Sequence, residues 1–275
     1  MLLRVGSRGS RLALTQAELA AERLRRPGVE IALLPITTAG DRDRTRPFGE
    51  IGSRGVFVKE LEEALLAGRI DVAVHSAKDM TSTDTDGLVV GAYLARDDPR
   101  DALCGATAVR PGMRIGTASA RRRAQLLALE PTLSIEPLRG NIDTRLRKRA
   151  ERGLDAVVLA ACGLDRLGLD GEIGTRLDPA VMLPEAGQGA LALQVRAGEE
   201  ALAARADHAE TRRRVEAERA VVAGVGGGCL APVAAHHDGS RLVGLIADPD
   251  GAWLERREGE DPVALGRELA AFAGR

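Results

Sequence analysis

The sequence predicts an α/β protein made of two α/β domains and a small C-terminal α+β domain. Short apolar runs rich in β-branched residues alternate with amphipathic segments over most of the chain, which indicates strands covered by helices. Charged residues or glycine turns follow directly where several of these runs end. The chain has 275 residues, of which 44% are hydrophobic and 29% are charged, and this is enough for two or three ordinary globular domains.

The first domain is expected to comprise residues 1–95 and 187–205. Ser10 is a suitable N-cap for a helix that ends before Pro27. Residues 40–55 mix charges and glycines without a period, so they predict a loop. The remaining elements are a helix at 56–66 and strands at 2–7, 29–38, 70–74, 88–94 and 190–195.

The second and third domains are expected at 96–186 and 206–275. Charge and proline increase abruptly near Arg96, which marks a crossing between domains, and Ala186 begins a second hinge. A β-α-β-α-β pattern predicts the second domain, with strands at 113–117, 133–138 and 156–160 and helices at 119–129 and 142–152. The third domain has predicted helices at 208–222 and 262–272 and a three-stranded meander at 232–236, 241–247 and 252–257.

Two opposite charges, Lys78 and Asp79, follow the apolar run 70–74 with no turn signal between. Open α/β sheets bind ligands beyond the carboxyl ends of their strands, so this pair is a candidate site. The alternative is a solvated ion pair that contributes little to stability, and the local pattern favours neither.

The turn after the strand at 113–117 predicts an anion site. Thr117 and Ser119 supply hydroxyl donors at a helix N-terminus, and Arg121, Arg122 and Arg123 follow. Three positive charges in a first turn oppose the helix dipole, and this cost favours a bound anion. The alternative is a basic helix face that lies in solvent.

The same arrangement recurs at two other strand ends. Arg139 and Arg145 flank a glycine turn in which Asn141 is the expected helix cap. In the first domain, Arg8 and Ser10 are expected to face the second domain across a cleft.

The three cysteines are too few and too scattered for a disulfide framework or a zinc site, so no metal is expected. Cys104 and Cys162 lie in apolar sequence, which is typical of buried structural thiols. Cys229 follows three glycines and is expected on an open loop, although burial is the commoner fate of a thiol. His236 alternates with its neighbour on a predicted strand and is expected to be exposed, so a Cys–His hydrolase is not favoured.

Composition excludes several other classes of function. The net charge of −1 gives no global attraction to nucleic acid or to a membrane surface, and aromatic residues make up only 2% of the chain. No apolar run is long enough to span a bilayer, and the first residues have no signal-peptide pattern. We therefore expect a cytoplasmic protein without nucleic acid or membrane partners.

Seven short stretches occur in an order that resembles the porphobilinogen deaminase (hydroxymethylbilane synthase) family over nearly the whole chain. They begin at Gly6, Gly55, Val74, Gly116, Leu138, Gly187 and Gly227, and they read GSRGS, GVFVKELE, VHSAKD, GTASARR, LRGN, GQGA and GGC. The sequence departs from the usual family pattern at Arg11, Glu50, Thr81, Ala118 and Gly226, and none of these departures removes an assigned charge.

The resemblance implies two domains similar to periplasmic binding proteins, with the active site between them, and a third domain that carries a dipyrromethane cofactor. It implies a transferase of tetrapyrrole (haem-type) biosynthesis. Such an enzyme joins four porphobilinogen units head to tail into hydroxymethylbilane and releases ammonia at each step. The cofactor acts as a primer and stays attached to the enzyme.

The resemblance also implies roles for individual residues. Asp79 is the catalytic carboxylate, and Cys229 bears the cofactor through a thioether. The cofactor carboxylates are bound by Lys78, Thr117, Ser119, Arg121, Arg122 and Arg145. The substrate is bound by Arg8, Ser10, Phe57, Arg139 and Arg145.

Two rival functions remain at this stage. A non-catalytic anion-binding protein of the periplasmic-binding-protein type would explain two α/β domains and strand-end arginines. It would not explain Asp79 among cations or Cys229 after three glycines. A nucleic-acid binder would use the arginines at 121–123 and 145–149, but the low aromatic content and near-neutral charge argue against it.

Overall fold

The computed structural model describes residues 1–38, 58–81, 85–226 and 232–273. The chain forms two compact units, one of Met1–Asp97 and Ala190–Arg213 and the other of Asp98–Gly189 and Arg214–Arg275. The second unit contains both the predicted second α/β domain and the C-terminal α+β part, so the three-domain division stays a prediction. Phe57 and Cys229 lie outside the described residues.

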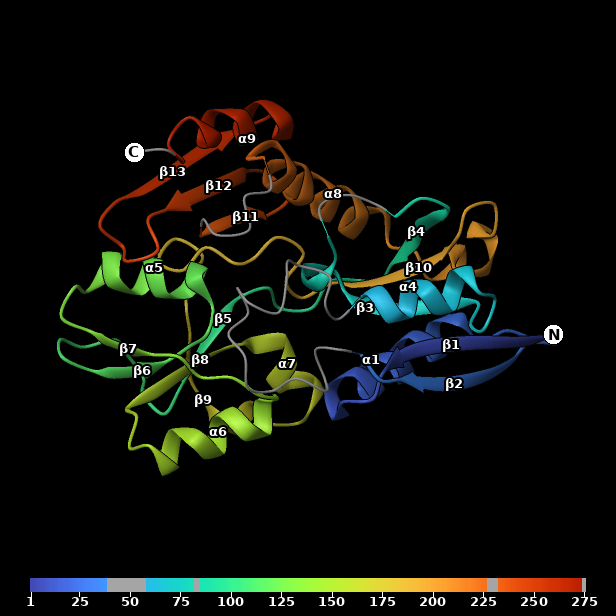
Figure 1. Ribbon diagram of the computed structural model, residues 1–275, viewed down its shortest axis with the longest axis horizontal. Helices are drawn as coiled ribbons and strands as arrows, with labels where there is room; N and C mark the ends of the chain where they lie inside the picture. Colours follow the sequence, from blue (N-terminus) through green and yellow to red (C-terminus); the bar gives the residue numbers. More distant parts are fainter. Residues whose placement is uncertain (39–57, 82–84, 227–231, 274–275) are drawn as a thin grey trace. The chain divides into compact units, whose positions relative to one another are not determined.

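The first unit is built around a sheet of order β2-β1-β3-β10-β4 among its described residues (Figure 1). β1 pairs in parallel with β2 and β3, whereas β10 is antiparallel to both β3 and β4. The elements are β1 (Leu2–Arg8), α1 (Arg11–Leu24), β2 (Glu30–Ile36), α4 (Lys59–Leu66), β3 (Val72–Ser76), the 3₁₀ turn η1 (Ala77–Asp79), β4 (Leu88–Tyr93), β10 (Leu191–Arg196), η3 (Glu200–Leu202) and η4 (Ala204–Ala206).

The first sheet of the second unit has the order β7-β6-β8-β5-β9 within the described residues. β6 is parallel to β7 and β8, and β5 is antiparallel to β8 and β9. The elements are β5 (Asp101–Cys104), β6 (Arg114–Gly116), α5 (Ala120–Leu129), β7 (Ser134–Glu136), α6 (Ile142–Glu151), β8 (Ala156–Ala160), α7 (Ala161–Arg166), η2 (Asp170–Glu172) and β9 (Ile173–Arg176).

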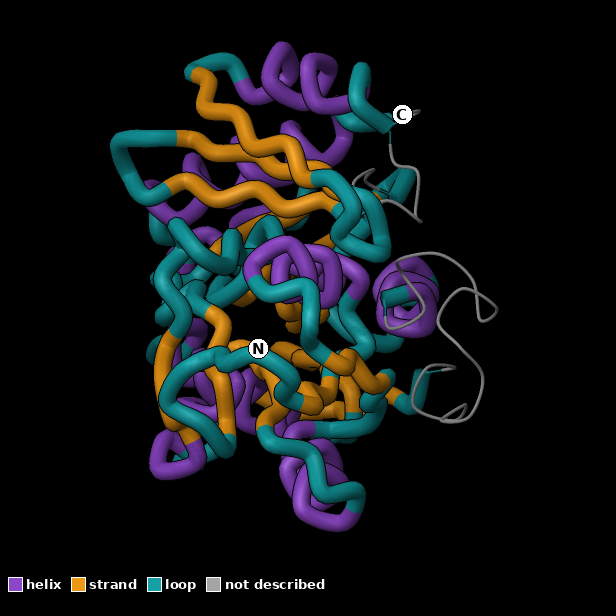
Figure 2. The backbone as a smooth tube through the Cα atoms, turned by 90° about the vertical axis from the view of Figure 1, so that its left-hand side faces the viewer, coloured by secondary structure: helices purple, strands orange, loops and turns teal. Residues whose placement is uncertain are grey.

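The C-terminal part of the second unit is an antiparallel sheet of order β11-β12-β13 with a helix-covered face (Figures 1 and 2). One face packs Val233, Leu242 and Ile246 against Val221 and Leu265 of the helices. The other face packs Leu245 and Ala247 against Ala124 and Leu183. The elements are α8 (Ala209–Gly224), β11 (Val233–His237), β12 (Leu242–Ala247), β13 (Leu254–Gly259) and α9 (Pro262–Ala270).

The predicted fold class, α/β with a small three-stranded antiparallel domain, is confirmed. β5, β9 and α7 were not predicted, because each is six residues or shorter and contains at least one charged residue, which makes it resemble loop sequence. The chain passes from the first unit to the second between Asp97 and Asp98, and β10 lies in the first sheet.

In each five-stranded sheet, the fourth strand in the order given above, β10 or β5, runs antiparallel to both of its neighbours. β5 starts three residues after the chain enters the second unit, and β10 starts one residue after it returns to the first. As a result, β5 and β10 begin at the edge of the sheet where their neighbouring strands, which run in the opposite direction, end.

The close approach of β9 to the segment after β5 gives a test of this packing. A Cβ at Gly174 would overlap the Ala106 carbonyl, whereas a Cβ at Gly171 would meet nothing within 4 Å. We expect Gly174→Ala to lower the free energy of unfolding by about 1–3 kcal/mol, because backbone cannot move aside cheaply. Gly171→Ala should leave it nearly unchanged. Denaturant unfolding of both variants measures this, and equal stabilities would contradict the described packing.

Candidate active site

The first unit gathers three of the predicted site residues at one edge of its sheet. β1 and β3 run parallel, with Gly6 opposite Ala73, so their carboxyl ends share this edge. Arg8 ends β1, and Lys78 and Asp79 lie on η1, directly after β3. All three side chains are half-buried. The backbone N–H of Ala77 donates to the carbonyl of Ala190 at 3.0 Å, which ties η1 to the start of β10.

A buried polar network lies behind this edge. The Nε2 atom of His75 is 3.0 Å from Gln194 Oε1, and Gln194 Nε2 donates to Glu62 Oε1 at 2.9 Å. The hydroxyl of Thr85 donates to the other oxygen of Glu62 at 2.9 Å. These bonds join β3, β10 and α4, so the strand that carries η1 is fixed on both sides. Sequence reasoning missed this network, because its members lie far apart in the chain.

The two serines predicted to bind ligand are both helix caps. Ser10 Oγ accepts from the Ala13 N–H at 3.3 Å, and Ser119 Oγ accepts from the Arg122 N–H at 3.4 Å. A hydroxyl that accepts at a cap keeps its own proton available for donation. Each serine can therefore cap its helix and still bind an anion at the helix N-terminus.

In the second unit, four strand ends share one edge of the sheet. β6, β7 and β8 run in parallel, so their carboxyl ends lie together. β5 runs the opposite way, and its first residue, Asp101, pairs with Ala160 at the end of β8. A carboxylate is therefore placed at the edge where Thr117 and Ser119 begin the turn into α5.

The Asp101 carboxylate is held between two arginine side chains. Arg121 Nη1 donates to Oδ2 at 2.8 Å, and Arg122 donates to Oδ1 from Nε at 3.1 Å and from Nη2 at 2.8 Å. Gln188 Nε2 donates to the same Oδ1 at 2.8 Å. The exposed fraction is 0% for Asp101, 4% for Arg121 and 5% for Arg122, so the cluster is excluded from water.

The charges of this cluster determine its protonation. Burial would raise the pKa of Asp101, but the two arginines outweigh it and hold the pKa well below the ordinary value. Burial would lower the pKa of Arg121, and the charges of Asp101 and Glu185 raise it instead. Asp101 and Arg121 are therefore both charged at neutral pH.

The basic run at 121–123 does not need a bound anion to offset its charge, contrary to the sequence argument. Asp101 lies against the first two arginines, and Arg123 pairs with Asp250 at 2.8 Å. Sequence reasoning missed Asp101, and its position directly after Pro99-Arg100 was interpreted only as a domain crossing.

The turn before α6 holds the other predicted arginines of this unit. Gly140 has a positive φ of 127°, a conformation that favours glycine. Arg145 Nε donates to the Gly140 carbonyl at 2.6 Å, so part of this guanidinium supports the turn itself. Arg139 is half-buried beside it. Asn141 occupies the N-cap position as predicted, but its side chain makes no capping hydrogen bond.

The cysteines and histidines are only partly as expected. Cys104 and Cys162 are buried free thiols, as predicted, and burial raises the pKa of Cys104 to about 11. His236 is buried, not exposed, and its Nδ1 lies 3.3 Å from Glu218 Oε1. Alternation on a strand gave the wrong face, because both faces of the C-terminal sheet are covered in part.

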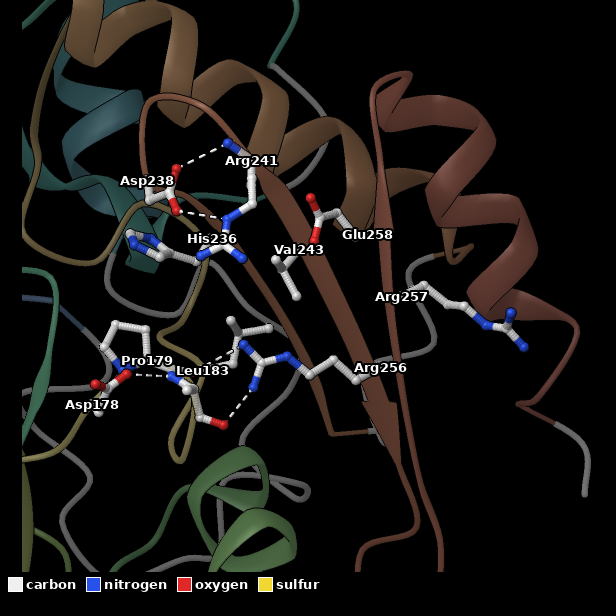
Figure 3. A pocket seen from close by; sticks show the side chains of 11 residues that line it. Asp178, Pro179, Leu183, His236, Asp238, Arg241, Val243, Arg256, Arg257 and Glu258 are labelled. Atoms are coloured by element: carbon white, nitrogen blue, oxygen red, sulfur yellow. Dashed lines mark hydrogen bonds and ion pairs between the residues drawn. The ribbon is translucent and has the colours of Figure 1, made fainter.

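A pocket of about 470 Å³ lies over the C-terminal sheet, where His236, Val243 and Glu258 are cross-strand neighbours (Figure 3). None of the predicted site residues that the structure describes lines it. Its arginines already have partners, since Arg241 pairs with Asp238 and Arg256 donates to two backbone carbonyls. The positive charges of Arg241 and Arg256 therefore do not indicate a ligand site in this pocket.

Comparison with known proteins decides the family. The family profile described as "Porphobilinogen deaminase, dipyromethane cofactor binding domain" matches residues 3–204, and "Porphobilinogen deaminase, C-terminal domain" matches residues 212–273. The chain belongs to the porphobilinogen deaminase family. Its expected family is thereby confirmed.

Individual relatives agree with this assignment. The chain is 46% identical to the porphobilinogen deaminase of Roseiflexus sp. strain RS-1, over 97% of this chain and 93% of that protein. It is 45% identical to the porphobilinogen deaminase of Pelobacter propionicus, over 98% of this chain and 92% of that protein. Among solved structures, a TRAP periplasmic solute binding protein from Desulfovibrio salexigens is 8% identical, with a TM-score of 0.44, over 78% of this chain and 74% of that chain.

Membership of the porphobilinogen deaminase family fixes the reaction. The protein is an enzyme of tetrapyrrole biosynthesis that condenses porphobilinogen into hydroxymethylbilane, and dipyrromethane is its cofactor. Within the described ranges, no helix is long and apolar enough to cross a membrane, and no cluster of His, Cys, Asp and Glu could hold a metal ion.

The second unit fits a cofactor that carries carboxylates. Within the described part of the chain, the Nε and Nη2 atoms of Arg121 are buried and have no hydrogen-bond partner. Its Nη1 is occupied by Asp101 and by the Leu183 carbonyl, at 2.8 Å and 2.7 Å. The free edge of the guanidinium is the edge that binds a carboxylate with two parallel hydrogen bonds.

Replacement of the buried carboxylate tests the cluster. We expect Asp101→Asn to lower the free energy of unfolding by about 3–5 kcal/mol at pH 7, because it leaves two buried arginines without their counter-charge. Asp250→Asn removes an exposed partner of Arg123 and should cost less than about 1 kcal/mol. Thermal or denaturant unfolding of both variants provides the measurement.

The contribution of Asp101 to the free energy of unfolding depends on pH in a predictable direction. The pKa of Asp101 is lower in the folded protein than in the unfolded chain, so its contribution is fully present above the ordinary pKa of an aspartate. The contribution is lost as the pH falls through the folded value. The stability gap between wild type and Asp101→Asn should therefore be constant near neutral pH and shrink in acid. A gap that widened in acid would contradict the assigned ion pairs.

Proposed function

We propose that the residues at the two sheet edges share the work of porphobilinogen condensation, with cofactor binding in the second unit and charge stabilisation in the first. The buried, unsatisfied edge of the Arg121 guanidinium is the observation that supports this division most directly. Arg122, fixed by Asp101 and by the Val158 carbonyl, maintains the positive potential beside it. Thr117, Ser119, Lys78 and Arg145 complete the proposed set of groups for the cofactor carboxylates.

Cys229 is the proposed attachment point of dipyrromethane, through a thioether. When bound, this group supplies the pyrrole carbon to which the first porphobilinogen is joined. The glycines before Cys229 in the sequence allow the backbone to come close to a bulky group. Cys104 and Cys162 are poor candidates for attachment, because both thiols are buried.

Asp79 is the proposed catalytic carboxylate. In each condensation the bond between the porphobilinogen methylene carbon and its amino nitrogen breaks, and ammonia leaves. A carbon–carbon bond forms at the end of the growing chain, whose pyrrole carbon then loses a proton. The methylene-pyrrole formed on the substrate is electron-poor, and a nearby carboxylate stabilises its positive charge. Asp79 is half-buried on a short 3₁₀ turn, which suits this role and the transfer of a proton.

The carboxylates of the incoming porphobilinogen are proposed to bind Arg8, Ser10, Arg139 and Arg145, with Phe57 as an apolar contact. Arg8 and Ser10 flank the turn from β1 into α1, where free N–H groups and a hydroxyl meet an arginine. Each porphobilinogen brings an acetate and a propionate, so a growing product needs several such cationic positions.

We also propose that the enzyme acts as a monomer in the cytoplasm and does not bind nucleic acid. The buried free thiols of Cys104 and Cys162 suit a reducing compartment. Burial of Arg121 and Arg122 argues against a nucleic-acid surface, since these side chains cannot reach a phosphate backbone.

Denaturing mass measurement of the purified protein tests the attachment. We expect an added dipyrrole mass on the wild-type chain, localised to the peptide that contains Cys229, and no added mass on Cys229→Ser. Cys162→Ser is the matched control and should keep the added mass. A Cys229→Ser protein that still carries the mass would refute the proposed attachment.

Substitution of the proposed catalytic carboxylate tests the mechanism. We expect Asp79→Asn to retain the cofactor mass and to lose about 100-fold or more in turnover, because an amide cannot stabilise the developing cation. Asp71→Asn is the control, since Asp71 precedes the other end of β3 and pairs with Arg4 at 2.6 Å. Its turnover should stay within about twofold of wild type. Near-normal ammonia release by Asp79→Asn would exclude Asp79 from the chemistry.

A further inference from the structure

The segment 187–189 is held by three separate groups of the second unit. The N–H of Gly187 donates to Glu218 Oε2 at 2.7 Å, and Arg166 Nη2 donates to the Gly189 carbonyl at 2.7 Å. Gln188, between them, is 0% exposed. Its Nε2 donates to the Pro99 carbonyl at 2.7 Å and to Asp101 Oδ1 at 2.8 Å.

These contacts involve the first two of the three places where the chain passes between the units. The chain enters after Asp97 and leaves after Gly189. Pro99 lies just inside the first crossing, and Gln188 lies just inside the second. One amide group therefore joins the two crossing segments to each other and joins both of them to the buried carboxylate.

The orientation of the Asp101 carboxylate depends on this amide. Oδ1 accepts from Arg122 and from Gln188, while Oδ2 accepts from Arg121. A carboxylate that rotates moves both oxygens, so a donor that fixes Oδ1 also fixes the direction in which Oδ2 holds Arg121. The two unsatisfied nitrogens of Arg121, Nε and Nη2, are positioned by the same constraint.

We propose that Gln188 is a positioning residue for the cofactor-binding arginines, acting through Asp101. The inference rests on the proposed assignment of Arg121 to the cofactor carboxylates. A primary amide is suited to this position, because its NH₂ group has two protons and can donate to two acceptors at once. A leucine removes both bonds, an asparagine is one methylene too short to reach both acceptors, and an ionised glutamate donates neither.

The first test separates turnover from substrate binding. In the cofactor-loaded enzyme, Gln188→Leu should lower kcat about tenfold, the effect of one lost hydrogen bond to a charged group, with KM for porphobilinogen within about twofold of wild type. Thr211→Val is the control. Thr211 is also buried, and its hydroxyl oxygen accepts from the Arg96 N–H at 3.0 Å in the first unit, away from the Asp101 cluster. The substitution should lower the thermal midpoint with a much smaller effect on kcat.

The second test uses pH and does not depend on folding of the leucine variant. In Gln188→Glu the new carboxyl lies beside Asp101, and the like charge raises its pKa. The protonated acid can donate one hydrogen bond, whereas the ionised form repels Asp101. The ratio of kcat for Gln188→Glu to kcat for wild type should therefore rise as the pH falls. Taking the ratio cancels titrations common to both enzymes.

The outcomes distinguish this inference from the proposed function. If Gln188→Leu loses stability but its kcat is no lower than that of Thr211→Val, Gln188 has only a structural role and the inference is overturned. A flat kcat ratio for Gln188→Glu would overturn it as well. A rise of about tenfold in the KM of Gln188→Leu for porphobilinogen would mean that Gln188 acts on substrate binding, and this result would also overturn the inference. Arg121→Met tests the parent assignment: unchanged cofactor mass and turnover in that variant would refute the role of Arg121 itself.

Discussion

The second unit depends on one fully buried carboxylate between two guanidinium groups. Removing three charges from water is costly, and the cost is offset only when the geometry lets each charge find an opposite one. Asp101 meets this condition with hydrogen bonds from Arg121, Arg122 and Gln188. Because the carboxylate starts β5 and the arginines start α5, the same bonds that lock the sheet edge to the helix also fix the directions of the guanidiniums.

The proposed roles of the two acidic residues at the strand edges make different demands on their surroundings, and Asp79 is a catalytic carboxylate only in that proposal. Asp101 has a strongly lowered pKa and no exposed surface, so it stays ionised and cannot exchange protons with a substrate. Asp79 is half-buried on the 3₁₀ turn after β3. A carboxylate that must meet a transient cation has to be reachable, and a carboxylate that must orient arginines has to be immobile. The chain separates these requirements into two residues.

Local sequence patterns predicted the strand ends and the helix starts well, because a cap or a turn is determined by a few adjacent residues. Ser10 and Ser119 were identified as caps or donors in this way. The partners of the arginines could not be predicted locally, since Asp101 is 20 residues from Arg121 and 87 from Gln188. Counting only the charges of the first turn led to the conclusion that an anion was needed there, although the chain supplies one itself.

The buried counter-charge of Asp101 restricts the direction from which Arg121 can bind an anion. Two bare guanidiniums at one helix start would repel each other and would accept any anion from any direction. With Asp101 and the Leu183 carbonyl on Nη1, Arg121 can present only the Nε and Nη2 edge. That edge fits the two oxygens of a carboxylate, and a lysine at this position could not reproduce it, because an ammonium has no planar fork. The buried acid therefore limits Arg121 to one geometry for binding a carboxylate.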